Sequence, residues 1–124
     1  MSETAPVHAD GYVHARDDQE YARLRNQAEM WRGASEILLD DIGLKPGMSC
    51  LDVGSGPGSV MRLMADRVGE TGTVTGLEID GELGRQALAD LKADTGADVR
   101  LVEGDVLHTE KPPGAPFDLT YCRF

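Results

Sequence analysis

The sequence predicts an α/β fold built on a parallel β-sheet, and two observations support this. Four short apolar runs rich in strand-forming residues cover 48–53, 73–77, 99–102 and 117–122. Between the first three runs, apolar residues recur every three or four positions, as they do along one face of a helix. Strands that alternate with helices form right-handed crossovers, which place the strands parallel in one sheet. The length of 124 residues suits one domain with a modest core.

Two helical segments are predicted before the first strand. Residues 1–16 show no periodicity, and we expect a flexible N-terminal tail there. A helix is predicted to begin at Asp17, whose side chain can accept from free backbone N–H groups, and to place the apolar residues of 21–31 on one face. Gly33 is expected to break this helix. A second helical segment then follows, and Gly43 is expected to end it.

The rest of the chain alternates between strands and helices. A helix is predicted to begin near Ser59 and to end at Gly69. Asp80 is a suitable cap for a further helix, which we expect to end at Gly96. The segment 111–116 contains three prolines, so it is predicted to be a loop and not a helix.

Composition and charge exclude several classes of protein. The chain has 12 Lys and Arg residues against 22 Asp and Glu, a net charge of −10. Because nucleic acids and anionic membranes bind basic surfaces, we predict no nucleic-acid partner and no membrane partner. No apolar run exceeds three residues, whereas a membrane-spanning helix needs roughly 20. The first residues lack the basic start and apolar stretch of a secretory signal, so we expect a cytoplasmic protein.

The cysteines and histidines of this sequence do not indicate a metal site, a disulfide framework or a catalytic base. Cys50 and Cys122 are too few for a disulfide framework or a four-ligand zinc site, so we predict no metal. Both are expected to be buried free thiols, since Cys packs as a small hydrophobe. His8, His14 and His108 are scattered, and the catalytic base stays unassigned.

Three alternating glycines form the most informative motif. Gly54, Gly56 and Gly58 follow the first predicted strand and lead directly into a helix. Glycine is needed where the backbone takes a positive φ angle or approaches a ligand closely. In open α/β sheets, ligands bind at the carboxyl ends of the strands. We therefore predict that these glycines form the floor of a binding pocket.

Each of the first three strands ends near an acidic residue. Asp52 precedes the glycines, Glu78 ends the second strand 20 residues after Gly58, and Asp105 follows the third strand. A carboxylate at that distance typically accepts hydrogen bonds from ribose hydroxyls. The glycine spacing is G-x-G-x-G, whereas dinucleotide-binding proteins have G-x-G-x-x-G and place a pyrophosphate on the helix. The acids therefore favour a positively charged nucleoside over one that carries phosphates.

The segment 51–58, Leu-Asp-Val-Gly-Ser-Gly-Pro-Gly, resembles the first motif of class I S-adenosylmethionine-dependent methyltransferases of the small-molecule type. The resemblance covers about residues 45–124. It implies that Glu78 binds the ribose and Asp105 the adenine. The adenine ring would then lie between Ile79 and Val106. The cofactor-binding residues that the resemblance implies are Asp52, Gly54, Ser55, Gly56, Gly58, Glu78, Ile79, Gly104, Asp105 and Val106.

The same resemblance implies a Rossmann-like three-layer sandwich, in which this chain holds a partial parallel sheet of strand order 3-2-1-4. Residues 17–44 would form an N-terminal helical lid, and residues 45–124 the cofactor-binding half of the usual domain. The C-terminal half is absent from the sequence, which favours a truncated piece of a longer protein over an unusually short member. Strand 4 would then be an exposed edge through which the chain could self-associate.

The expected function is transfer of a methyl group from S-adenosylmethionine to a small-molecule acceptor. Two alternatives stay open at this point. One is a module that binds the nucleoside, or a partner chain, without turnover. The other is a nicotinamide-dependent oxidoreductase, which the glycine spacing and Asp52 disfavour.

Overall fold

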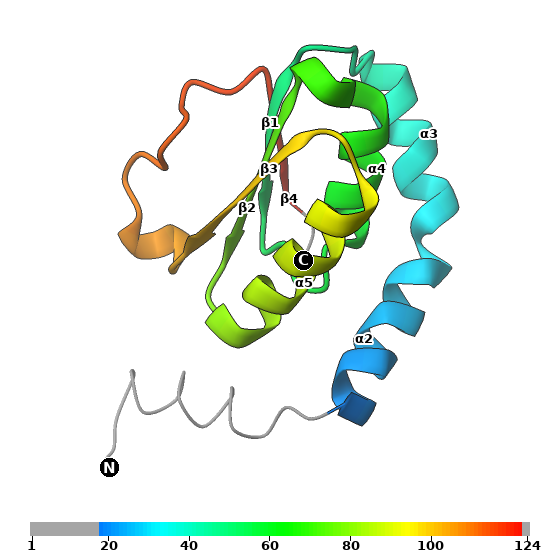
Figure 1. Cartoon of the computed structure of the whole chain (residues 1–124), viewed down its shortest axis with the longest axis vertical. Helices are drawn as coiled ribbons and strands as arrows, with labels where there is room; N and C mark the ends of the chain where they lie inside the picture. Colours follow the sequence, from blue (N-terminus) through cyan, green and yellow to red (C-terminus); the bar gives the residue numbers. More distant parts are fainter. Residues whose placement is uncertain (1–17, 123–124) are drawn as a thin grey trace.

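The computed structural model describes residues 18–122, so the predicted tail and the proposed cap at Asp17 lie outside the described residues. The described chain contains a single four-stranded sheet, in which every pairing is parallel and the order is β3-β2-β1-β4 (Figure 1). The strands are β1 Ser49–Val53, β2 Thr73–Glu78, β3 Asp98–Glu103 and β4 Leu119–Cys122. The predicted fold class and strand order are confirmed.

Four helices and two short 3-10 turns complete the described chain. The helices are α2 Asp18–Met30, α3 Arg32–Ile42, α4 Ser59–Val68 and α5 Gly81–Asp94, and the turns are η1 Gly69–Thr71 and η2 Val106–His108. Helices α3, α4 and α5 lie on one side of the sheet, while the loop from β3 to β4 arches over the other side (Figure 1). This loop includes the proline-rich segment 111–116, which cannot form a helix. Among the described residues, helices therefore cover one face of the sheet.

The hydrophobic core lies between the sheet and these helices. Cys50, Val74 and Val99 pair across β1, β2 and β3 and are at most 3% exposed. Met64 of α4 and Leu91 of α5 pack against them. Because side chains alternate along a strand, the residues two positions further on face the same helices. On β1 that residue is Asp52, so the core also fixes the direction of this acid.

Several predicted boundaries are correct. Gly43 ends α3 with a φ angle of 86°, the left-handed conformation typical of a helix C-cap. The Asp80 carboxylate caps α5 by accepting from the Leu83 N–H at 3.2 Å. Across the α3–α4 contact, the Arg67 guanidinium donates to the Asp40 carboxylate at 2.8 Å. The ion pair between Arg67 and Asp40 thus connects α3 to α4.

Other boundaries differ from the prediction. The break between the first two helices falls at Trp31, and Gly33 lies inside α3, where exposed glycine costs only about 1 kcal/mol. α5 ends at Asp94, two residues early, because the backbone of Thr95 is extended, with φ −129° and ψ 158°. The predicted fourth strand also starts two residues too soon, since Leu119 is the first residue of β4.

The cysteine prediction is half correct. Cys50 is fully buried, whereas Cys122 is exposed, because its side chain lies on the face of β4 opposite to the buried Tyr121. Within residues 18–122, none of the helices has the length and apolar character to span a bilayer. The cytoplasmic location stays a prediction.

Candidate functional site

The three glycines all adopt the conformation that the sequence predicts for them. The φ angles of Gly54, Gly56 and Gly58 are 73°, 53° and 84°, a region that other residues enter only with strain. A Cβ atom built at Gly54 or Gly56 would meet nothing within 4 Å. A Cβ atom at Gly58 would lie 3.1 Å from Cδ1 of Leu91. The first two glycines therefore leave open space at the sheet end, and the third allows α5 to pack closely.

Backbone hydrogen bonds attach this glycine loop to the neighbouring strand. The Leu77 carbonyl of β2 accepts from the Gly54 N–H at 2.7 Å and from the Ser55 N–H at 3.2 Å. Ser55 is 6% exposed, and its backbone carbonyl accepts from the Gly58 N–H at 3.0 Å. The loop is thus a fixed turn between β1 and α4.

Glu78 binds the glycine loop directly. Glu78 is 7% exposed, and its Oε1 accepts from the Gly56 N–H at 2.6 Å. Oε2 accepts from the Asp80 N–H at 3.0 Å. Hydrogen bonds between backbone N–H groups and an ionised carboxylate are shorter and stronger than neutral ones. The acid predicted to bind a ribose therefore lies against the floor of the predicted pocket.

Asp52 lies on β1 just before the glycine loop. This residue is 4% exposed, and its Cα pairs with Gly76 on one side and with Tyr121 on the other. It lines a small cavity of about 80 Å³. The other residues around this cavity are Ala28, Val53, Gly54, Ser55, Pro57, Ser59, Val60 and Tyr121. Asp52 thus contributes a buried acid to the space beside the glycines.

The end of β3 carries the third acid. The Gly104 N–H donates to the Glu78 carbonyl at 3.0 Å, which holds this turn beside β2. Oδ1 of Asp105 accepts from the Leu107 N–H at 3.0 Å and so caps η2. Ile79 and Val106, which follow β2 and β3, are each 51% exposed. The structure thus brings the predicted residues to one end of the sheet, while adenine binding by Asp105 stays a prediction.

Two residues that shape the site, Gly76 and Tyr121, were not predicted from the sequence. A Cβ atom at Gly76 would lie 2.7 Å from Oγ of Ser55 and 2.6 Å from Sδ of Met61, so this glycine lets the loop and α4 approach β2. A glycine inside a strand is a known sign of such a close approach. Tyr121 lines the small cavity, and its hydroxyl lies 3.2 Å from Oγ of Ser35. That contact joins β4 to α3.

Cys50 lies close to the site but cannot act as a nucleophile at neutral pH. Burial, followed by the negative charges of Asp118 and Asp52, raises the pKa of the Cys50 thiol to about 12. Because the thiolate is the reactive form, Cys50 stays protonated and inert.

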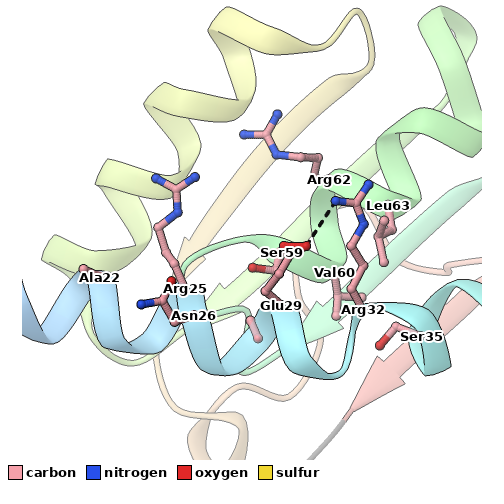
Figure 2. A pocket seen from close by; sticks show the side chains of 11 residues that line it. Ala22, Arg25, Asn26, Glu29, Arg32, Ser35, Ser59, Val60, Arg62 and Leu63 are labelled. Carbon is pink, nitrogen blue, oxygen red and sulfur yellow. Dashed lines mark hydrogen bonds and ion pairs between the residues drawn. The ribbon is translucent and has the colours of Figure 1, made fainter.

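A larger cleft lies between the N-terminal helices and α4. Its volume is about 470 Å³, and Figure 2 shows side chains of α2, α3 and α4 around it. Its lining residues are Ala22, Arg25, Asn26, Ala28, Glu29, Arg32, Ser35, Ser59, Val60, Arg62 and Leu63. Three of these residues also line the small cavity, so the two spaces adjoin.

The comparison with protein families identifies the chain. The model of the protein-L-isoaspartate(D-aspartate) O-methyltransferase (PCMT) family matches residues 10–123. The chain belongs to this family. The resemblance of residues 51–58 to a methyltransferase motif predicted such a family, and this prediction is confirmed.

Curated relatives of the PCMT-family chain are methyltransferases with different acceptors in their names. Nocamycin O-methyltransferase of Saccharothrix syringae is 39% identical over 79 residues, which are 61% of this chain and 28% of that protein. Ribosomal RNA large subunit methyltransferase E of Haloarcula marismortui is 34% identical over 92 residues, or 72% of this chain and 32% of that protein. The absence of a nucleic-acid partner therefore stays a prediction.

A solved structure shows the same fold. A SAM-dependent methyltransferase from Aquifex aeolicus superposes on 86% of this chain and 56% of its own, with a TM-score of 0.70 and 23% identity. The PCMT-family chain spans between 23% and 37% of the length of the first curated relatives it matches.

Proposed function

We propose that the protein binds S-adenosylmethionine at the glycine loop and takes part in methyl transfer to a small-molecule acceptor. One observation carries this proposal above the others. The buried Glu78 carboxylate accepts from the Gly56 N–H, and there is open space beside Gly54 and Gly56, where an added Cβ atom would meet nothing within 4 Å. This arrangement presents a negative charge and a side-chain-free backbone at the same place.

The residues present fit an S-adenosyl nucleoside. When bound, it would supply a methyl group on a positively charged sulfur. Asp52 and Glu78 would favour that charge and disfavour a pyrophosphate at the glycine loop. Ile79, which follows β2, and Val106, which follows β3, are both half exposed and would offer apolar surface to the adenine ring. The main task left to the protein is to hold the acceptor in line with the reacting atoms.

A small-molecule acceptor suits the space beside the glycine loop. The cleft of about 470 Å³ falls in the size range of small-ligand sites. The match to nocamycin O-methyltransferase supports an acceptor of this kind. The net charge of −10 opposes the phosphate backbone that a ribosomal RNA acceptor would present.

Substitution of Glu78 tests the cofactor site. Calorimetric titration of Glu78→Ala with S-adenosylhomocysteine should show a loss of binding free energy on the order of 1.5–3 kcal/mol, because a charged hydrogen-bond acceptor is removed. Glu78→Gln keeps an acceptor oxygen for the Gly56 N–H but loses the charge. Its affinity for S-adenosylhomocysteine should therefore lie between those of Glu78→Ala and the wild type.

Glu103→Ala is the matched control for this experiment. Glu103 pairs with Glu78 in the β2–β3 register, but its exposed carboxylate binds Arg85 on the outside of α5. Its removal should leave the affinity for S-adenosylhomocysteine unchanged. Unchanged affinity in Glu78→Ala, or tighter binding of NAD⁺ than of S-adenosylhomocysteine by the wild type, would refute the assignment.

A further inference from the structure

The cleft between the N-terminal helices and α4 concentrates positive charge in an acidic chain. Arg25 of α2, Arg32 of α3 and Arg62 of α4 all line it, and Figure 2 shows their side chains around one space. The chain has only 12 Lys and Arg residues and a net charge of −10. Glu29 is the single acidic residue among the lining residues. The lining therefore has a net positive charge.

The ion pairs around the cleft leave part of this charge available. Arg32 pairs with Glu29 and Glu36, at 3.2 Å each. Arg62 pairs with Asp94 at 3.1 Å, on the α5 side of the cleft. In these exposed pairs a guanidinium can exchange partners at little cost, because surface ion pairs contribute only about 0–1 kcal/mol.

Arg25 differs from the other two arginines. Its guanidinium lies 5.7 Å from the centroid of the Tyr21 ring, and no carboxylate of residues 18–122 forms an ion pair with it. The Tyr21 hydroxyl in turn donates to the Asp90 carboxylate at 3.2 Å. The ring therefore supports Arg25 from one side and leaves its hydrogen-bond donors for a ligand.

The cleft continues into the space beside the glycine loop. Ala28, Ser59 and Val60 line both the cleft and the small cavity that contains Asp52. A molecule in the cleft could thus extend toward the place where the cofactor methyl group would lie. Asp52 and Glu78 lie at the glycine loop, whereas three arginines line the cleft, two of which form exposed ion pairs.

We propose that the cleft binds an anionic group of the methyl acceptor, a carboxylate or a phosphate, through Arg25, Arg32 and Arg62. Arginine suits this role because its planar fork of N–H donors matches the oxygens of both groups. A cavity of about 470 Å³ is large enough for a small acceptor. The inference rests on the proposed methyl transfer for its biological meaning, but anion binding can be measured without it.

Nuclear magnetic resonance can test the proposal on the whole chain. With S-adenosylhomocysteine present, the chain is titrated separately with malonate and with inorganic phosphate, while the Nε–H signals of the arginines and the amide of Ser59 are followed. Saturable shifts of Arg25, Arg32 and Arg62 are expected with at least one anion. The anion that binds more tightly identifies the carboxylate or the phosphate as the natural group.

Two variants make the test specific. Arg25→Ala removes an exposed side chain from a helix and should weaken anion binding about tenfold, the effect of one charge-assisted hydrogen bond. Arg100→Ala is the matched control, because Arg100 is an exposed arginine that pairs with Asp98 on β3, outside the cleft. It should leave the affinity unchanged. Equal weakening in both variants, or no saturable shift of the three arginines, would overturn the proposal.

The design separates this inference from the proposed function. If S-adenosylhomocysteine does not bind but the anion shifts remain, the cofactor assignment fails and the anion site stands. If S-adenosylhomocysteine binds but neither anion shifts the arginines, the anion site fails alone. An RNA oligonucleotide that binds more tightly than both anions, and loses affinity in Arg25→Ala, would contradict the small-molecule acceptor.

Discussion

Gly56 and Gly58 share a left-handed backbone but differ in what surrounds them. Alanine at either position would cost about 1–2 kcal/mol of folding free energy through backbone strain. At Gly58 the added methyl group would also lie 3.1 Å from Leu91 and 3.2 Å from Ala87, closer than most real contacts. Gly58→Ala should therefore destabilise the chain more than Gly56→Ala, which chemical denaturation would measure.

Cofactor affinity should show the opposite order. The methyl group of Gly56→Ala would project into open space at the predicted site, so this variant should bind S-adenosylhomocysteine less tightly than Gly58→Ala does. A larger loss of affinity in Gly58→Ala than in Gly56→Ala would contradict the roles given to the two glycines.

At the scale of residues, the sequence reveals those whose chemistry is local. Gly54, Gly56 and Gly58 could be predicted because a positive φ angle is a property of a residue and its neighbours in the chain. Tyr121 could not, because its contact with Ser35 joins two elements 86 positions apart. The grouping of the three arginines around the cleft could not be predicted for the same reason, since each lies on a different helix.

At the scale of elements, Arg67 of α4 connects α4 to α3 through ion pairs with Asp40 at 2.8 Å and with Glu36 at 3.8 Å. The Arg67 guanidinium donates to the Asp40 carboxylate and so lowers the pKa of Asp40 below its ordinary value of 3.8. A lowered pKa in the folded state means that the pair stabilises the fold above pH 3.8. That contribution is lost as the pH falls through the folded-state pKa.

Asp40→Asn tests this contact. The variant should have a slightly lower free energy of unfolding than the wild type at pH 7, since the Asp40 carboxylate is exposed to water, which weakens the pair. The difference should shrink as the pH falls below 3.8. Denaturant titrations across that range would measure it, with Asp41→Asn, an exposed neighbour on α3, as the control. A difference that grows on acidification would have the wrong sign for this account.

Element positions could be predicted better than element ends. The strands and helices of residues 48–103 lie where the apolar periodicity places them, because periodicity depends on the buried face that each element needs. The ends depend on single contacts. The extended backbone of Thr95 ends α5 before the glycine that the sequence favours as a terminator.

At the scale of the whole molecule, β4 is the edge of the sheet. It pairs with β1 on one side, and among the described residues no strand pairs with its other side. Thr120 and Cys122 of this strand are exposed. An unpaired edge offers backbone donors and acceptors to another strand, so we expect self-association through β4.

Sedimentation velocity over a range of concentrations would test this expectation. The wild-type chain should shift toward dimers as the concentration rises. Thr120→Lys should reduce the dimer fraction, because a charged lysine on an edge strand opposes pairing. Gln86→Lys, which adds the same charge to an exposed position of α5, should not. A chain that stays monomeric at all concentrations would contradict the prediction that β4 mediates self-association.

A crystal structure of the chain with S-adenosylhomocysteine would test the cofactor assignment most directly. We expect the ribose hydroxyls to lie within hydrogen-bond distance of the Glu78 carboxylate, about 2.5–3.2 Å. The cofactor assignment also requires the homocysteine part to pass over Gly54 and Gly56. A nucleoside bound elsewhere on the chain, with Glu78 in contact only with the backbone groups of Gly56 and Asp80, would contradict it.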